Sequence, residues 1–245
     1  MDKKILGILG GMGPAATVDL YGKIVAMTEA SCDAEHIRTI IDSNAQIPDR
    51  TAAILSGGTN PVPAMESALE NLKKCGAEVV IIPCNTAHYF LPALQQKAEQ
   101  ERAGIRFLSM IEATAGACAD LNPKTAAILA TKGTLESGIY QKSLDAHGVT
   151  YIVPDHEGRD VLMDVIYNGV KAGAEPGQYL PGFRKLLERM GTQGADYFIL
   201  ACTELPIAFR ELSHAEISAA KFAAIDPTEV LAAAAIAACG YRVKN

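Results

Sequence analysis

One passage of the chain occurs twice, and this repetition constrains the fold more than any other feature of the sequence. Residues 76–86 read GAEVVIIPCNT, and residues 194–204 read GADYFILACTE. An ungapped alignment pairs the glycines, the alanines, the acidic residues and, after the apolar run, Cys84 with Cys202. A repeat of this kind sets the architecture before any single element is assigned.

A weaker repeat precedes each copy. Residues 3–13 (KKILGILGGMG) resemble residues 123–133 (PKTAAILATKG), and each segment reads as an apolar strand that ends in a turn containing glycine. The sequence therefore predicts two equivalent halves, each with a later strand that ends in a cysteine. Chance repetition of a helix–strand pattern explains the strands but not the matched cysteines, so we favour duplication.

Short runs rich in isoleucine and valine alternate with helical patterns along the chain. This alternation is typical of βαβ units and of parallel sheets buried on both faces. We expect strands at 5–9, 39–42, 79–83, 106–109, 125–130, 149–153, 197–201 and 224–226, and helices at 15–30, 63–75, 87–101, 110–121, 136–147, 159–171, 177–191 and 227–238. The predicted domains are residues 1–118 with 222–245, and residues 119–221.

Length and composition bound the class of protein. The chain has 245 residues, of which 49% are hydrophobic, so it can build a substantial core. Its formal net charge of −6 argues against nucleic acid as a partner and leaves no basic patch for a membrane surface. The longest apolar run, residues 230–239, is too short to span a bilayer, and we see no export signal. We therefore expect a cytoplasmic protein.

Six cysteines are present, and their spacing predicts no metal site. None forms a C-x-x-C pair or stands at zinc-ligand spacing to a histidine. A chain of this size with a full core does not need disulfides, so we expect reduced thiols. The four cysteines outside the repeat are expected to be packing residues or residues without a role: Cys32, Cys75, Cys118 and Cys239.

Polar residues follow the ends of the predicted strands, where parallel sheets bind their ligands. These segments are 10–14 (GGMGP), 42–44 (DSN), 84–86 (CNT) and 202–204 (CTE). A cysteine at the start of a helix has its pKa lowered from about 8.5 by the positive helix end. Two such thiols on opposite faces of a small carboxylic acid can invert its α-carbon without a cofactor, because one removes a proton and the other delivers one.

These residues also have structural interpretations. Free cysteine is among the most buried residue types, and Asn85, Thr86 and Thr203 are of the types that cap helices. Residues 11–16 match G-x-G-x-x-A, a dinucleotide-binding pattern, with Asp42 as an imperfect ribose partner. The dinucleotide interpretation leaves the paired cysteines unexplained.

Together the motifs resemble those of the aspartate/glutamate racemase superfamily. The likeness rests on LGGMGP (9–14), IPDRT (47–51), PCNTAH (83–88) and ACTELP (201–206), and it covers nearly the whole chain. The chain is most similar to the cofactor-independent aspartate racemases. Glutamate racemases usually carry a histidine where this chain has Glu204.

The resemblance implies an α/β protein of two pseudo-symmetric three-layer αβα domains, with mainly parallel sheets and the active site in the interdomain cleft. It implies an isomerase that racemises aspartate, with glutamate as a further substrate, without pyridoxal phosphate, other cofactor or metal, and as a homodimer. Cys84 and Cys202 are implied to be the catalytic acid/base pair. The residues implied to bind the amino-acid substrate are Gly11, Met12, Arg50, Asn85, Thr86, Lys171 and Thr203.

Two other classes of function stay open at this point, a different enzyme with paired cysteines and a binding protein. Maleate isomerisation and hydantoin racemisation also use paired cysteines, and an arginine for a second carboxylate disfavours hydantoins but not maleate. A non-catalytic protein that binds small acids is a different class, and the intact cysteine pair argues against it. Two residues close to the repeated cysteines also have two interpretations each. His88 either orients a cysteine or its loop, or packs in the first turn of a helix. Glu204 either changes the acidity of Cys202 or caps a helix.

Overall fold

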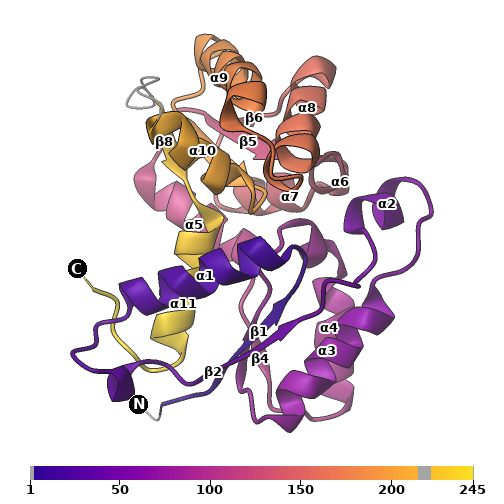
Figure 1. Cartoon of the computed structure of the whole chain (residues 1–245), viewed down its shortest axis with the longest axis vertical. Helices are drawn as coiled ribbons and strands as arrows, with labels where there is room; N and C mark the ends of the chain where they lie inside the picture. The colour runs from indigo at the N-terminus through magenta and orange to yellow at the C-terminus, as the bar shows by residue number, and fades with distance from the viewer. Residues whose placement is uncertain (1–2, 215–221, 245) are drawn as a thin grey trace. The chain divides into compact units, whose positions relative to one another are not determined.

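Alternating apolar strands and helices build two α/β units. The computed structural model describes residues 3–214 and 222–244 (Figure 1). One unit comprises residues 1–113 and 228–245, and the other comprises residues 114–227. The chain leaves the first unit within α5 (Met110–Leu121) and returns to it at the start of α11 (Pro227–Ala238).

The first unit contains a four-stranded parallel sheet in the order β2-β1-β3-β4. Its strands are β1 (Leu6–Gly10), β2 (Thr39–Ser43), β3 (Val79–Ile81) and β4 (Arg106–Phe107). Its helices are α1 (Pro14–Met27), α2 (Arg50–Leu55), α3 (Val62–Lys74) and α4 (Leu91–Gln100), with the short 3-10 helices η1 (Asp33–Glu35) and η2 (Thr86–Phe90).

Side chains of this sheet belong to two hydrophobic cores, one on each face, because successive residues of a strand point to opposite faces. Leu6 and Ile8 pack with Leu20 of α1 and Ile236 of α11 on one face. Leu9 packs with residues of α3 and α4 on the other face. Figure 1 shows these two pairs of helices on either side of the strands. The predicted three-layer arrangement is confirmed for this unit.

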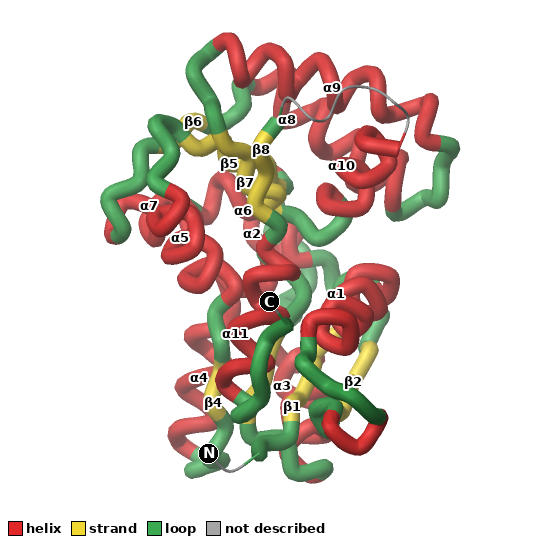
Figure 2. Tube along the Cα trace, turned by 90° about the vertical axis from the view of Figure 1, so that its left-hand side faces the viewer, coloured by secondary structure: helices red, strands yellow, loops and turns green. Residues whose placement is uncertain are grey.

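The second unit contains a parallel sheet in the order β6-β5-β7-β8. Its strands are β5 (Ala126–Ala130), β6 (Tyr151–Ile152), β7 (Tyr197–Ala201) and β8 (Ala223–Ile225). Its helices are α6 (Lys132–Ser137), α7 (Ile139–Ala146), α8 (His156–Met163), the π-helix η3 (Asp164–Val170), α9 (Pro176–Thr192) and α10 (Leu205–His214). Residues of α8, η3, α9 and α10 pack on one face of the sheet, and Figure 2 shows α5 and α7 on the other side of its strands.

The two sheets share strand order and register, which agrees with the internal repeat. Leu6 of β1 stands opposite Val79 of β3, and Ala126 of β5 stands opposite Tyr197 of β7. The sequence repeats align the same residues, Leu6 with Ala126 and Val79 with Tyr197. Therefore β3 and β7 occupy equivalent places, and the two repeated cysteines follow equivalent strands.

Several helices differ from the sequence-based prediction for local reasons. The predicted helix 136–147 is divided at Gly138, whose φ of 68° separates α6 from α7. The predicted helix 87–101 begins as η2 and turns α-helical at Leu91, where the following Pro92 suits a first helical turn. The predicted helix 159–171 is α8 continued by the π-helix η3. The sequence pattern did not predict α2 or α10.

Candidate functional site

The carboxyl ends of β1, β2 and β3 lie at one edge of the first sheet, because the three strands are parallel and adjacent. Gly11 lies at this edge with a φ of 90°, and a Cβ added to it would stand 2.3 Å from the backbone of Asn44. The turn after β1 therefore meets the turn after β2 at a position that requires glycine. The Gly11 N–H donates a hydrogen bond of 2.9 Å to the Thr17 hydroxyl, which ties the turn to α1.

Arg50, at the start of α2, joins three backbone segments at this edge. Its Nη1 donates to the carbonyls of Ile47 and Pro48 at 3.0 and 2.9 Å, and its Nη2 donates to the carbonyl of Met12 at 3.3 Å. The side chain is 9% exposed, and within residues 3–214 and 222–244 its Nε has no hydrogen-bond partner. A buried cation held only by carbonyl dipoles favours an anion beside it. The geometry thus fits a ligand carboxylate at Arg50.

Cys84 lies just past the end of β3 and belongs to the same apolar cluster as Met12 and Ile47. It is 6% exposed, and the Asn85 and Thr86 that follow it are also buried. The first unit thus places predicted residues from three separate segments at one sheet edge. Asn85 has a helical backbone before η2, and its side chain does not cap that helix.

His88 positions the Cys84 segment through both nitrogens of its ring. The Met110 N–H donates to Nε2 at 3.0 Å, so Nε2 is the unprotonated nitrogen and Nδ1 carries the hydrogen. Nδ1 then donates to the backbone carbonyl of Cys84 at 2.9 Å. Burial lowers the pKa of His88 from 6.5 to about 4, so the ring is neutral at physiological pH. Of the two roles considered for His88, the contacts favour orientation of the cysteine segment.

Cys202 lies just past β7 in the second unit, and its thiol contacts a carboxylate. Sγ donates to Oε2 of Glu204 at 3.0 Å, and the Thr203 hydroxyl donates to the same oxygen at 3.2 Å. Cys202 is 7% exposed and Glu204 is 5% exposed. Burial and then the charge of Glu204 raise the pKa of the Cys202 thiol well above its usual value, whereas Lys171 acts in the opposite direction. The contacts favour the first of the two roles considered for Glu204, tuning of the thiol.

Lys171 reaches this carboxylate from the end of the π-helix η3. Its Nζ lies 3.8 Å from Oε1 of Glu204 and 4.7 Å from the centre of the Tyr167 ring. The Lys171 N–H bonds to the Ile166 carbonyl five residues earlier, which is the π-helical pattern. Single π-helical turns occur frequently at functional sites. The second unit thus places three predicted residues, Lys171, Cys202 and Thr203, around Glu204.

Two buried threonines at the carboxyl end of β5 were not predicted as site residues. Thr131 caps α6 by accepting from the Thr134 N–H at 3.2 Å, and the two hydroxyl oxygens lie 3.0 Å apart. Thr131 occupies the place in the second repeat that Gly11 occupies in the first. A polar residue directly after an apolar strand was the feature of the sequence that could have indicated Thr131. It was overlooked because the turn after β5 is only weakly similar in sequence to the turn after β1.

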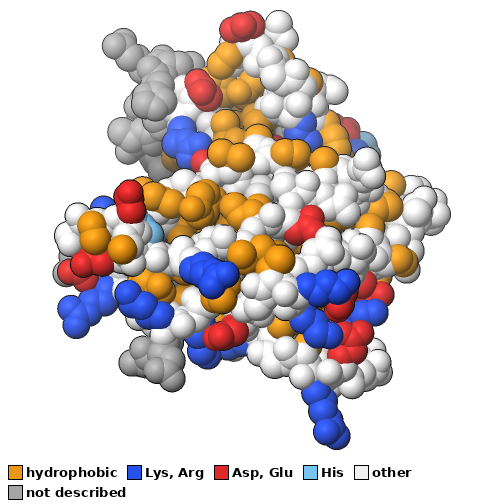
Figure 3. Space-filling view, turned by 60° about the horizontal axis from the view of Figure 1, so that its bottom comes forward, with side chains coloured by type: hydrophobic (Ala, Val, Ile, Leu, Met, Phe, Trp, Pro, Cys, Tyr) orange, Lys and Arg blue, Asp and Glu red, His pale blue; other side chains and the backbone are white. Residues whose placement is uncertain are grey.

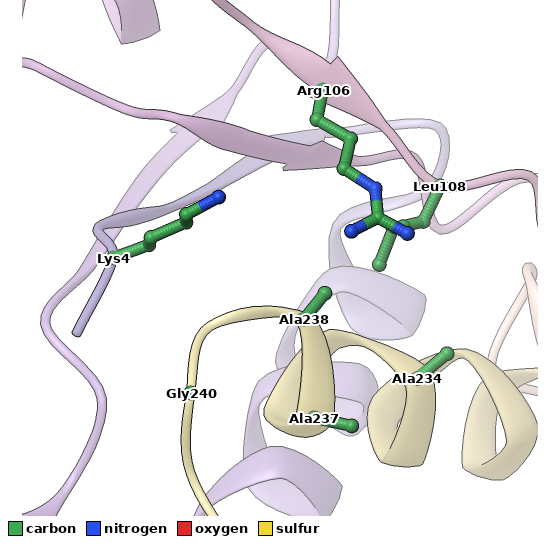
Figure 4. Close-up of a pocket in the computed structure, with 7 residues that line it drawn as sticks. All are labelled: Lys4, Arg106, Leu108, Ala234, Ala237, Ala238 and Gly240. Carbon is green, nitrogen blue, oxygen red and sulfur yellow. The ribbon is translucent and has the colours of Figure 1, made fainter. Parts of the chain in front are cut away.

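Other parts of the described chain offer fewer chemical groups. Residues 3–214 and 222–244 contain no cluster of three or more potential metal ligands, and no helix in these ranges is long and apolar enough to cross a membrane. A cavity of about 600 Å³ lies near the amino ends of β1 and β4, away from Cys84 (Figure 4). It is lined by Lys4, Arg106, Leu108, Ala234, Ala237, Ala238 and Gly240. Asp42, the ribose partner of the dinucleotide interpretation, accepts a hydrogen bond of 2.8 Å from Asn71.

The family model and the similar proteins agree on one class of protein, the amino-acid racemases. The family model for Asp/Glu/hydantoin racemases matches residues 9–235. A solved aspartate racemase from Picrophilus torridus is 31% identical, with a TM-score of 0.79, and the match covers 98% of this chain and 96% of that one. The broad-specificity amino-acid racemase RacX of Bacillus subtilis (strain 168) is 27% identical over 82% of this chain and 86% of its own length. A glutamate racemase of Campylobacter jejuni is 35% identical over 60% of this chain and 55% of its own length.

The chain therefore belongs to the Asp/Glu/hydantoin racemase family. Its relatives are racemases, so the class of enzyme is an isomerase that acts on amino acids.

Proposed function

We propose that this protein racemises aspartate and that Cys84 and Cys202 are its two acid/base groups. The observation that carries the proposal is the equivalence of the two thiols. Each is almost fully buried, and each follows the carboxyl end of the equivalent strand in two units that share strand order and register. A mechanism with two bases on opposite faces of one carbon needs such a pair.

In the proposed reaction the Cys84 thiolate removes the α-proton of one enantiomer and becomes a thiol. Cys202 gives its S–H proton to the opposite face of the same carbon and becomes a thiolate. One C–H bond breaks and one forms, so no electrons are gained or lost and the product is the mirror image. The free enzyme is left with the two protonation states exchanged, which suits it to the reverse reaction.

Glu204 explains why Cys202 begins as the proton donor. Its carboxylate accepts the S–H hydrogen bond at 3.0 Å, and the raised pKa keeps the thiol protonated at neutral pH. In the reverse reaction the Cys202 thiolate left by the forward reaction removes the proton, and the raised pKa makes this thiolate a strong base. Lys171, 3.8 Å from the other carboxylate oxygen, offsets the negative charge that develops there.

The cation at Arg50 favours a substrate with a second carboxylate. The guanidinium is nearly buried, and its three hydrogen bonds go to neutral carbonyls. A carboxylate bound there forms a charge-assisted hydrogen bond, whereas an uncharged side chain leaves the cation without a counter-charge. In this proposal Asn85, Thr86 and Thr203 bind the α-carboxylate, so the two acidic groups of aspartate have separate partners.

The test is incubation of the protein with L-aspartate, and separately with D-aspartate, in D₂O. We expect loss of the α-proton NMR signal together with loss of optical rotation, and no requirement for added pyridoxal phosphate. Iodoacetamide should abolish the activity, and aspartate should protect against it. A need for pyridoxal phosphate, or full activity after both cysteines are alkylated, contradicts the mechanism.

A second candidate is racemisation of a broader set of amino acids. RacX, a relative over most of this chain, is a broad-specificity racemase, and Glu204 replaces the histidine usual in glutamate racemases. A panel of single amino acids, scored by loss of optical rotation, separates the two candidates. Maleate belongs in the same panel, because Arg50 also suits that dicarboxylate; formation of fumarate without racemisation of any amino acid replaces the proposal with the isomerase alternative.

A further inference from the structure

The cavity near the amino ends of β1 and β4 is built within the first unit alone. Its lining residues come from the segment before β1, from β4 and the segment after it, and from α11 with the turn that follows. Its volume of about 600 Å³ lies within the range of roughly 300–1,000 Å³ that is usual for pockets that hold small molecules. Cys84 follows the carboxyl end of β3, so the cavity and this cysteine lie at opposite edges of the sheet.

Two cations, Lys4 and Arg106, project into this cavity from the same side of the sheet. Leu6 of β1, Val79 of β3 and Arg106 of β4 are in register, and residues in register on neighbouring parallel strands point to the same side. Leu6 and Val79 pack in the cluster that contains α11 residues, so Arg106 also points toward α11. Lys4 stands two residues before Leu6 and shares this side by the alternation of a strand. Figure 4 shows both side chains extending over α11.

Neither cation has an acidic partner in the part of the chain that the structure describes. Elsewhere charges are commonly paired: Lys73 lies 3.0 Å from Glu101, and Figure 3 shows side chains of both signs interspersed on one face of the molecule. Among the described residues no carboxylate lies within ion-pair distance of the Lys4 or Arg106 side chain. Two unpaired positive charges at one cavity favour a negative charge inside it.

The helix side of the cavity is apolar, because α11 presents alanines there. Ala234, Ala237 and Ala238 line the cavity, and Glu229 is the only charged residue of the helix. A surface helix normally turns polar side chains away from the core, whereas α11 turns methyl groups toward the cavity. These small side chains leave the space open and give it an apolar floor, and Leu108 adds to the apolar lining.

Backbone hydrogen bonds hold the walls of the cavity in place. The Lys4 N–H donates to the Cys239 carbonyl at 3.1 Å, which ties the segment before β1 to the end of α11. The Arg106 N–H donates to the Glu78 carbonyl at 2.8 Å, which ties β4 to the start of β3. The cavity is therefore formed before any ligand arrives, and binding does not require ordering of the chain around it.

We propose that this cavity binds a small carboxylic acid that has an apolar body and no amino group. Arg106 and Lys4 bind the carboxylate, since a guanidinium can hold both of its oxygens, and the apolar body lies on the alanines of α11. The lining side chains are all basic or apolar, so the ammonium group of an amino acid or the hydroxyls of a sugar would find no side-chain acceptor there. The cavity therefore disfavours aspartate, and the inference is independent of the proposed substrate.

A saturation-transfer NMR titration of the full chain with phenylacetate tests the proposal, because this probe has a carboxylate, an apolar ring and no amino group. We expect saturable binding with a dissociation constant on the order of 1 mM, and excess aspartate should not displace the probe. Phenylacetamide has the same shape without the charge, and phenylglycine adds an ammonium group. Both should bind about tenfold more weakly, the cost of one charge-assisted hydrogen bond or more.

Variants locate the site on the folded chain, with far-ultraviolet circular dichroism as the check on folding. Arg106→Gln and Lys4→Gln should each weaken phenylacetate binding about tenfold, and Ala234→Leu should abolish it by filling the cavity. Lys142→Gln and Ala146→Leu make the same changes at exposed positions of α7 and should bind like the wild type.

The measurement is binding and not racemisation, so its result does not depend on which amino acid the enzyme uses. Absence of saturable binding in the wild type, displacement of the probe by aspartate, or equal affinity for phenylacetamide overturns the proposal. Wild-type affinity in Arg106→Gln and Ala234→Leu overturns it as well, because the probe then binds elsewhere.

Discussion

The Cys84 and Cys202 segments occupy equivalent places on equivalent strands, yet they are held by different kinds of group. The Cys84 segment is fixed through its backbone carbonyl by a neutral histidine, His88. The Cys202 segment is fixed through its sulfur by the carboxylate of Glu204. Strand geometry is thus shared by the two repeats, and the chemical environment of the thiol is not. In the two-base reaction proposed above, the thiols carry opposite protonation states at the start of each direction, so the difference in environment bears directly on that proposal.

The largest effect is expected from loss of either thiol. Cys84→Ser and Cys202→Ser should each lower racemisation by about 10²–10⁴-fold, because serine is a far weaker acid than cysteine and a general acid or base contributes a factor of this size. Each variant should still exchange the α-proton of one enantiomer, and the two variants should prefer opposite enantiomers. The measurement is deuterium incorporation from D₂O, followed separately for L- and D-aspartate.

The control for both variants is Cys75→Ser, since Cys75 is exposed at the C-terminal end of α3 and precedes β3, whereas the two site cysteines follow their strands. It should racemise at the wild-type rate. If Cys84→Ser or Cys202→Ser also keeps that rate, the assignment of two equivalent catalytic thiols is wrong.

The next largest effect concerns the stability of the folded protein, and it tests whether His88 holds the Cys84 segment. The pKa of His88 is about 4 in the folded protein, against about 6.5 for a histidine in an unfolded chain. Between these values the unfolded chain binds a proton at this histidine that the folded chain does not. The contribution of neutral His88 to the free energy of unfolding is therefore fully present above pH 6.5 and is lost as the pH falls toward 4. The shift corresponds to about 3 kcal/mol in the free energy of unfolding.

Urea unfolding of wild type and His88→Gln at a series of pH values measures this contribution. The variant should be less stable at pH 7 and should lose less stability than the wild type on acidification. His156→Gln is the matched control, because His156 is exposed in an ion pair with Asp160, and it should follow the wild-type curve. Parallel curves for wild type and His88→Gln would remove His88 as the group that holds the Cys84 segment.

The sequence could predict the strands and the cysteines, because both depend on local pattern. Alternating apolar runs define the two sheets, and the repeated passage places Cys84 and Cys202 at their carboxyl ends. The supporting contacts depend on residues far apart in the chain, which no local pattern encodes. Arg50 reaches Met12 across 38 residues, and His88 reaches Met110 across 22. The π-helix before Lys171 was not predicted for a different reason: over seven residues an apolar pattern cannot separate α-helical from π-helical turns.

A third prediction compares the two cations, one in each unit. Arg50 is nearly buried and locked by three carbonyls, whereas the Lys171 side chain is 28% exposed and already lies near Glu204. Arg50→Ala should therefore lower kcat/KM for aspartate by roughly ten- to a hundred-fold, the cost of one charge-assisted hydrogen bond. Lys171→Ala should have a smaller effect, because solvent screens a partly exposed charge.

Steady-state kinetics with aspartate and with alanine as substrates separate these roles. Loss of Arg50 should affect aspartate alone, since alanine has no second carboxylate. An equal loss with both amino acids assigns Arg50 to the support of the turns it joins. If Lys171→Ala lowers kcat/KM for aspartate more than Arg50→Ala does, Lys171 in the second unit contributes more to use of this substrate than Arg50, and the expected order is wrong.

The smallest effect is expected from Glu204→Gln, and it bears most directly on the asymmetry of the two thiols. Glutamine keeps the size of the side chain and a carbonyl oxygen for the S–H, but it removes the negative charge. Because the charge of Glu204 helps to raise the pKa of the Cys202 thiol, that pKa should fall in the variant.

Cys202 should then react with iodoacetamide at a lower pH than in the wild type, while Cys84 should react as before. Peptide mass mapping distinguishes the two alkylated cysteines. Racemisation should fall by less than the factor of about 10²–10⁴ expected for loss of a thiol, and kcat/KM should fall equally in both directions because L- and D-aspartate have the same free energy. Glu188→Gln, at an exposed ion pair with Arg184 on α9, is the control and should change neither property. An unchanged alkylation profile of Cys202 in Glu204→Gln means that burial alone sets the state of this thiol, and the two cysteine segments then differ in their contacts but not in their chemistry.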